Sequence, residues 1–134
     1  MKLERLWIVG ILILLVMVAC STQTRPYTGE WYAQAANGKK VKMNFKKEKV
    51  TIGEDEFSYE ETGHGEFNNG RTFFTITDKQ KEYTIAFPEK DNDIAMMLQP
   101  DDVEKEPNVG TILYAMHREE YPNFDDYIGR YLVK

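Results

Sequence analysis

Apolar and polar residues alternate along a series of short segments, and this period of two limits the chain to a mainly β fold. In the clearest segment, Lys40 to Lys46, the apolar residues Val41, Met43 and Phe45 alternate with lysine and asparagine. Successive side chains of a strand point to opposite faces, so the pattern predicts a strand with one buried face. Comparable segments, rich in β-branched and aromatic residues, occupy positions 49–53, 56–61, 71–77, 81–88, 94–99 and 111–118.

Short polar stretches separate these segments and predict turns between antiparallel strands. Asn68-Asn69-Gly70 is typical of a hairpin. The glycine-rich stretch Thr62 to Gly65 is expected to be a turn, and the polar stretch Pro100 to Gly110 a loop. This order predicts an antiparallel up-and-down meander of about eight strands. Such a meander can bury its edges by closing into a barrel, and an open two-layer sheet is the alternative.

The C-terminal segment has the period of an amphipathic helix, which we expect over residues 123–133. Asn123 is a favourable N-cap, and Asp125 and Asp126 fall in the first turn, where the helix dipole favours negative charge. One apolar stripe follows at helical spacing, formed by Phe124, Tyr127, Ile128, Tyr131 and Leu132. The stripe predicts that the helix packs against the sheet as part of the domain.

A run of 13 uncharged, mostly apolar residues, Leu6 to Val18, precedes the single cysteine, Cys20. The run is shorter than the roughly 20 residues that a spanning helix needs. It matches the apolar core of a secretory signal, which is about 7–15 residues long. The sequence Met-Val-Ala-Cys resembles the lipobox of bacterial lipoproteins. The resemblance implies a signal peptide over residues 1–19 and an acylated tether over residues 20–26.

The lipobox resemblance also implies a place in the cell. Cys20 would carry a diacylglyceryl thioether and, after cleavage, would become the N-terminus of a lipoprotein. Two acyl chains are enough for stable anchoring where one is not. We therefore expect the protein on the extracytoplasmic face of the cell membrane, most simply in a Gram-positive host. In a host with two membranes, we would expect it on the outer membrane.

The charge of the expected mature chain excludes some partners and stabilising devices. The whole chain has a net charge of −5. Loss of residues 1–19 removes two basic residues and one acidic residue, which leaves 15 basic and 21 acidic residues, a net charge of −6. Nucleic acid binding demands basic patches and is not expected. No second cysteine is present to form a disulfide, so the core alone must hold the domain.

Two short motifs at opposite ends of the strand series resemble the calycin superfamily, to which the lipocalins belong. Gly29-Glu30-Trp31 stands on the expected first strand, and Arg118 ends the last strand, just before the helix. The resemblance implies a closed barrel over residues 27–134, in which the guanidinium of Arg118 stacks on the indole of Trp31. An aromatic face attracts a guanidinium, so this contact is physically reasonable.

The candidate chemistry is that of a binding protein and not of an enzyme. His64 and His117 belong to no nucleophile–base set or metal-ligand spacing, so we expect neither catalysis nor a cofactor. An eight-stranded barrel is either filled by side chains or holds one small ligand. The first possibility predicts an interaction protein that contacts an envelope protein, a cell-wall hydrolase or a host factor. The second predicts a pocket for a small apolar or amphipathic ligand, lined by Met43, Phe45, Phe57, Tyr59, Tyr83, Phe87, Met96 and Tyr114.

Overall fold

The computed structural model describes residues 25–67, 70–102 and 106–131, and these residues form one antiparallel sheet and one helix. The prediction of a mainly β fold with a C-terminal helix is confirmed. Cys20 lies outside the described residues. The described strands are β1 (Gly29–Ala35), β2 (Lys40–Phe45), β3 (Lys49–Ile52), β4 (Asp55–Ser58), β5 (Glu60–Glu66), β6 (Thr72–Thr77), β7 (Glu82–Ala86), β8 (Ile94–Asp102) and β9 (Glu106–His117).

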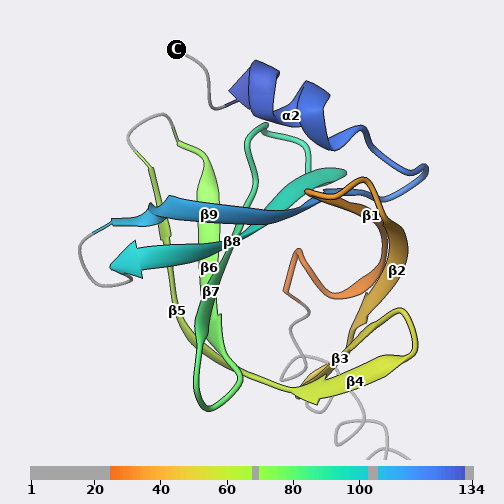
Figure 1. Ribbon diagram of the computed structural model, residues 1–134. Coiled ribbons are helices and arrows are strands. Elements are labelled where there is room, and N and C mark those ends of the chain that lie inside the picture. Colours follow the sequence, from red (N-terminus) through yellow and green to blue (C-terminus); the bar gives the residue numbers. More distant parts are fainter. Residues whose placement is uncertain (1–24, 68–69, 103–105, 132–134) are drawn as a thin grey trace, which may run out of the picture.

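The sheet is strongly curled, and the first strand of the chain, β1, lies beside the last strand of the chain, β9. The strand order is β4-β3-β2-β1-β9-β8-β7-β6-β5. Figure 1 shows β1 and β2 on one side of the curl, β5 to β7 on the opposite side, and β8 and β9 between them. In the described part of the chain no backbone ladder joins the edge strands β4 and β5. The sheet is therefore not closed by hydrogen bonds, and the closed barrel stays a prediction.

Nine strands are present instead of about eight because the segment expected at 56–61 divides at Tyr59. The residues before Tyr59 pair with β3, whereas those after it pair with β6. The expected turn over Thr62 to Gly65 is wrong, because these residues lie within β5. His64 pairs there with Phe74, and the ladder outweighs the local preference of glycine for turns.

The expected loop between Pro100 and Gly110 is also wrong over most of its length. Strand β8 continues to Asp102 and β9 begins at Glu106, so the two strands form a long hairpin. Register shifts interrupt this hairpin after Met97 and after Pro100. Backbone pairing in a hairpin does not require an apolar sequence, and for this reason the polar composition of the segment was misleading.

The main core fills the concave face of the sheet. The residues predicted to alternate inward on β2 are found there: Met43 and Phe45 are buried, and Val41 packs against them. Strand β7 contributes Ile85 in the same way, and so does Phe87, which directly follows the end of this strand. The other buried members of this cluster are Tyr27, Trp31, Ala33, Val50, Tyr59, Phe74, Ile76, Ala95, Met97 and Met116.

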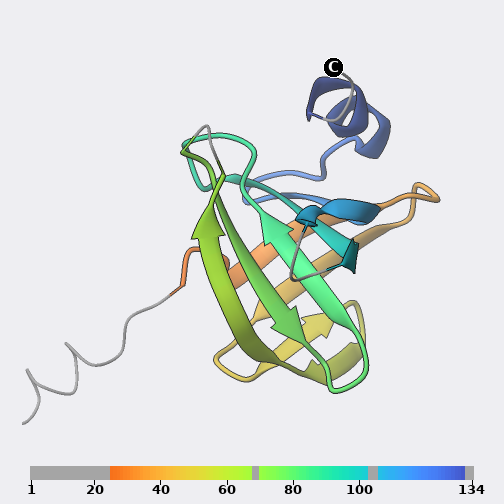
Figure 2. The same ribbon diagram turned by 90° about the vertical axis from the view of Figure 1, so that its left-hand side faces the viewer.

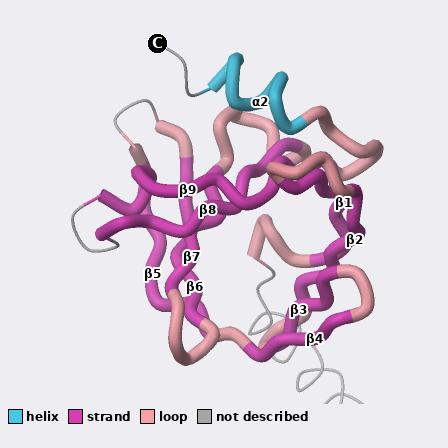
Figure 3. Tube along the Cα trace, viewed as in Figure 1, coloured by secondary structure: helices cyan, strands magenta, loops and turns pink. Residues whose placement is uncertain are grey.

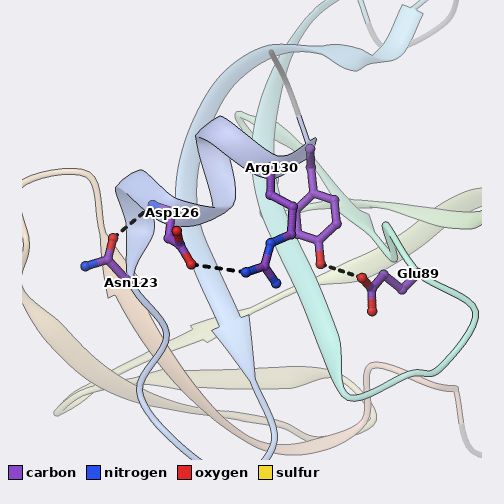
Figure 4. Close-up of polar contacts among 5 residues, drawn as sticks. Glu89, Asn123, Asp126 and Arg130 are labelled. Carbon is purple, nitrogen blue, oxygen red and sulfur yellow. Dashed lines mark hydrogen bonds and ion pairs between the residues drawn. The ribbon is translucent and has the colours of Figure 1, made fainter. Parts of the chain in front are cut away.

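The helix α2 (Phe124–Tyr131) packs on the outer face of the sheet, beside β8 and β9 (Figures 1 and 3). Its Tyr127 is buried against Met96 and Ala115, and the Tyr127 hydroxyl donates to the carbonyl of Met116 at 3.2 Å. As expected, Asn123 caps the helix: its Oδ1 accepts from the amide of Asp126 at 2.9 Å (Figure 4). The helix therefore belongs to the domain.

At the C-terminal end of α2 a polar contact joins the helix to the β7–β8 turn. The Tyr131 hydroxyl donates to Oε1 of Glu89, in the β7–β8 turn, at 2.9 Å (Figure 4). On the helix itself, Arg130 and Asp126 form an exposed ion pair at 3.3 Å. An exposed pair of this spacing contributes little to stability, because water and salt screen it. The buried face around Tyr127 is therefore the main source of docking energy.

Candidate functional site

One end of the curled sheet is closed by a contact between Trp31 on β1 and Arg118, which follows β9. The guanidinium carbon of Arg118 lies 3.7 Å from the centre of the Trp31 ring, and Trp31 is only 1 % exposed. Gly29 has a φ of +102°, and a Cβ added there would lie 3.3 Å from Nη1 of Arg118. A glycine is thus required at this position for its backbone conformation and for the close approach of Arg118.

Arg118 also joins the end of the last strand to the residues at the start of the domain, through hydrogen bonds to backbone carbonyls. Its Nη1 donates to the carbonyl of Glu30 at 2.8 Å, and its Nη2 donates to those of Pro26 at 2.6 Å and Thr28 at 2.9 Å. Burial lowers the pKa of Arg118, an effect that the carboxylate of Asp93 opposes. Because a guanidinium stays charged in proteins, these are charge-assisted hydrogen bonds. We call this region, Pro26 to Thr28 with Arg118, the N-terminal end.

Tyr27 places an aromatic ring in the core at the N-terminal end. Its ring makes edge-on contacts with Phe45, Tyr59 and Phe74, with centroids 5.3–6.3 Å apart. Its hydroxyl donates to Oε1 of Glu61 at 2.8 Å, and Arg25 pairs with the same carboxylate at 2.9 Å. Burial, then the hydrogen bond to Glu61, raises the pKa of Tyr27. The phenol therefore remains neutral and available as a donor.

The opposite end of the sheet contains a cavity of about 230 Å³. We call it the mouth end; it carries the β3–β4 turn (residues 53–54) and the β6–β7 turn (residues 78–81). In Figure 2 the first described residues, in orange, lie to the left of the sheet, whereas the green β6–β7 turn lies at the lower right. The cavity is lined by Val50, Ile52, Asp55, Phe57, Ser58, Tyr59, Ile76, Asp78, Tyr83, Met97, Leu113 and Tyr114.

Four of the eight residues predicted to line a pocket are found around this cavity: Phe57, Tyr59, Tyr83 and Tyr114. Three others, Met43, Phe45 and Phe87, are buried in the filled part of the core. The interior is therefore filled toward the N-terminal end and hollow toward the mouth end.

Met96 does not line the cavity, contrary to expectation. It lies on the outer face beneath α2, while its neighbour Met97 lines the cavity. Both faces of β8 are covered here, so the apolar run contains no alternation that distinguishes the two methionines. Tyr27 was also missed as a core residue, because it lies in a turn before the first strand and has no periodic pattern.

The rim of the cavity is polar, and three of the four aromatic rings around the cavity carry hydroxyl groups. Oδ1 of Asp78 accepts from the amides of Gln80 at 3.3 Å and Lys81 at 3.0 Å, which fixes the carboxylate in the turn. Its Oδ2 accepts from the Tyr83 hydroxyl at 3.4 Å. Burial and the nearby Asp78 raise the pKa of Tyr83. The cavity thus has an apolar wall and an acidic rim.

The two histidines make local contacts and belong to no metal-ligating group among the described residues. His64 lies on exposed β5 against the ring of Phe74, and Nδ1 of His117 accepts from the amide of Glu119 at 3.0 Å. Within the described ranges no group of three or more His, Cys, Asp or Glu side chains is placed to hold a metal ion. Nor does this part of the chain include a helix with the length and apolar character to cross a bilayer.

Comparisons with protein-family models, curated proteins and solved structures find no match to this chain. The geometry and chemistry of the site itself are therefore the basis for inferring a function.

Proposed function

We propose that the protein is a membrane-anchored extracytoplasmic lipoprotein whose mouth-end cavity binds a small apolar or amphipathic ligand. The cavity of about 230 Å³ is the observation that carries this proposal. Binding sites for small molecules are typically concave and mostly apolar, with a few polar groups that orient the ligand. The aromatic residues Phe57, Tyr59, Tyr83 and Tyr114 supply a large contact area at a small cost in side-chain entropy.

A calycin-like barrel is the form of the sheet that we propose for this function. Strand β1 pairs with both β2 and β9, so the first and last strands are neighbours. Strands β4 and β5 are separated by Tyr59 alone, and the amide of Tyr59 donates to the carbonyl of Glu48 at 2.9 Å. We treat β4 and β5 as one bent strand that contacts β3 with its first half and β6 with its second. On this view eight strands surround the cavity.

The proposed anchor would determine which way the opening of the cavity faces relative to the membrane. If Cys20 carries the lipid, only five residues separate it from Pro26, and such a segment spans at most about 20 Å. Pro26 is at the N-terminal end, held by Arg118, and the cavity is at the other end. The mouth would therefore face away from the membrane, toward ligands in the surrounding medium.

An interaction protein with a solid interior has less support. Among the described residues the exposed large hydrophobic side chains are Phe57 at 44 % and Tyr121 at 38 %. Phe57 lines the cavity, whereas Tyr121 packs edge-on against Tyr32 on the outside of β1. The two therefore do not form one apolar patch of the kind that marks a docking surface.

Native mass spectrometry of the full protein, purified from its own host in a mild detergent, tests the proposed function. We expect a bound species that leaves on gentle activation and whose mass differs from that of detergent or lipid. Recovery of the free protein alone, together with no binding of small apolar probes, would contradict the proposal.

A further inference from the structure

The chemistry of the cavity selects among small amphipathic ligands, and this inference rests on the proposed function. The deeper wall consists of aliphatic and sulfur-containing side chains, including Val50, Ile76, Met97 and Leu113. The rim has two carboxylates, Asp55 from the start of β4 and Asp78 from the β6–β7 turn. A ligand that fits both parts has an apolar body and a polar head of complementary charge.

Neither rim carboxylate forms an ion pair with another described residue. Among the described residues the ion pairs are Arg25–Glu61, Lys49–Glu56 and Arg130–Asp126, and neither Asp55 nor Asp78 takes part in one. The described residues that line the cavity include no lysine, arginine or histidine. The described lining of the cavity therefore carries two negative charges and no positive charge.

Aromatic rings strengthen the same preference. Phe57, Tyr59, Tyr83 and Tyr114 line the same cavity as the two carboxylates. Ring faces attract cations, and they do so more strongly where water is excluded. The hydroxyl of Tyr83 donates to Asp78, so this aromatic ring and this carboxylate are neighbours in the cavity wall. An anionic head would be repelled by the two carboxylates, and a neutral head would gain nothing from them.

We propose that the cavity binds a small cationic amphiphile, with its ammonium group between Asp55 and Asp78 and its apolar body against Met97 and Leu113. The volume of about 230 Å³ lies below the ~300–1,000 Å³ of typical sites for drug-sized ligands. The ligand is therefore a short-chain or single-ring amine, and a full lipid would not fit.

Calorimetric titration of the full protein in phosphatidylcholine nanodiscs, with empty nanodiscs as the blank, tests this proposal. The probes are hexylammonium, n-hexanol and hexanoate, which share one apolar chain and differ in head charge. We expect hexylammonium to bind about fivefold or more tightly than n-hexanol, since each partly exposed ion pair contributes up to about 1 kcal/mol. Hexanoate should bind most weakly. Added salt should weaken the binding of hexylammonium and leave that of n-hexanol unchanged.

Two variants test whether the rim carboxylates cause the preference for hexylammonium. Asp55→Asn and Asp78→Asn should each reduce the affinity for hexylammonium two- to threefold (about 0.5 kcal/mol) and leave that for n-hexanol unchanged. Glu120→Gln, an exposed change near α2, is the matched control and should have no effect. Asp55→Asn keeps the test valid if Asp78→Asn loosens its turn.

The outcomes separate the two proposals. Equal affinities for the three probes, or a preference for hexanoate, would overturn the cationic ligand while the apolar cavity stands. An undiminished preference for hexylammonium in both asparagine variants would also overturn it. Failure of all three probes to bind would overturn the cavity function and this inference together.

Discussion

The guanidinium of Arg118 lies 3.7 Å from the centre of the Trp31 ring and also caps three backbone carbonyls from the chain entry. One side chain thus joins the end of β9 to the residues before and within β1. The contact lies at the N-terminal end of the sheet, whereas the proposed ligand cavity lies at the mouth end.

A double-mutant cycle measures this contact. Trp31→Ala should lower the free energy of unfolding by about 3–5 kcal/mol, the range for truncating a buried aromatic residue. Arg118→Ala should lower it by about 3 kcal/mol, because carbonyls lose charge-assisted partners. We expect a coupling of about 1 kcal/mol or more from chemical denaturation. Arg118→Lys, which keeps the charge but not the planar fork, should fall between the parent and Arg118→Ala. A coupling near zero would show that the stacking contributes nothing.

Thr84 offers a stabilising substitution. Its side chain is fully buried, and its Oγ1 has no hydrogen-bond partner. Thr84→Val removes this unsatisfied hydroxyl at nearly constant volume and should raise the free energy of unfolding by about 1 kcal/mol. The matched control is Thr75→Val on the adjacent strand, where Oγ1 accepts from the Thr62 hydroxyl at 3.0 Å. Thr75→Val should therefore lower the free energy of unfolding. A loss of stability in both variants would contradict the view that the Thr84 hydroxyl is unsatisfied.

Alkaline pH should weaken the docking of α2. Burial, then the neighbouring Tyr131, raises the pKa of Tyr127 to about 12. Above the ordinary tyrosine pKa of about 10 the unfolded chain loses this proton while the folded chain keeps it, so stability falls as pH rises. Between about pH 10 and 12 the contribution of Tyr127, on the order of 2 kcal/mol, should be lost.

Denaturation at a series of pH values in that range measures the effect. Tyr127→Phe should make the dependence shallower, although it also loses the hydrogen bond to Met116. A slope should remain, because burial also raises the pKa of Tyr27 and Tyr83. Tyr121→Phe, at an exposed site, should leave the dependence as steep as in the parent. Identical slopes for Tyr127→Phe and the parent would contradict the assignment to Tyr127.

Cys20→Ser tests the proposed lipid anchor. The hydroxyl of serine cannot form the thioether, so the variant should lose the acyl mass and either leave the membrane fraction or remain unprocessed. Fractionation combined with intact mass measurement checks both outcomes. Ser21→Ala, next to the cysteine, should be processed and retained like the parent. A Cys20→Ser protein of processed size that still sediments with membranes would contradict the anchor.

The sequence predicts the strands best where only one face is buried. On β2 the lysines mark the solvated face and Met43 and Phe45 the core, so the alternation is clear. On β8, α2 covers the outer face, and the apolar run shows no alternation that could separate Met96 from Met97. The position of a helix in three dimensions is not encoded in the local pattern of the strand that it covers.

Glycines in β5 show a second limit of local rules. The stretch Thr62 to Gly65 has the composition of a turn, but it pairs with β6. A Cβ added to Gly65 would lie 2.9 Å from Cζ of Phe73 on the neighbouring strand. The glycine therefore makes room for a cross-strand ring, which is a tertiary role. The position of the cavity likewise depends on which part of the interior the core side chains fill in three dimensions. The sequence could predict only that aromatic residues would line it.

The methionine methyl groups provide the most direct test of the cavity. Met97 lines it, whereas Met96 lies on the outer face under α2, so two adjacent residues report on opposite faces of one strand. We propose a titration of the methyl-labelled protein in nanodiscs with n-hexanol, followed by NMR. We expect a saturable shift of the Met97 signal and no shift of Met96. The shift should be lost in Leu113→Trp but kept in Thr111→Trp, a change at an exposed site. A Met97 signal that does not move, or that moves in the same way in Leu113→Trp, would contradict a ligand-binding cavity.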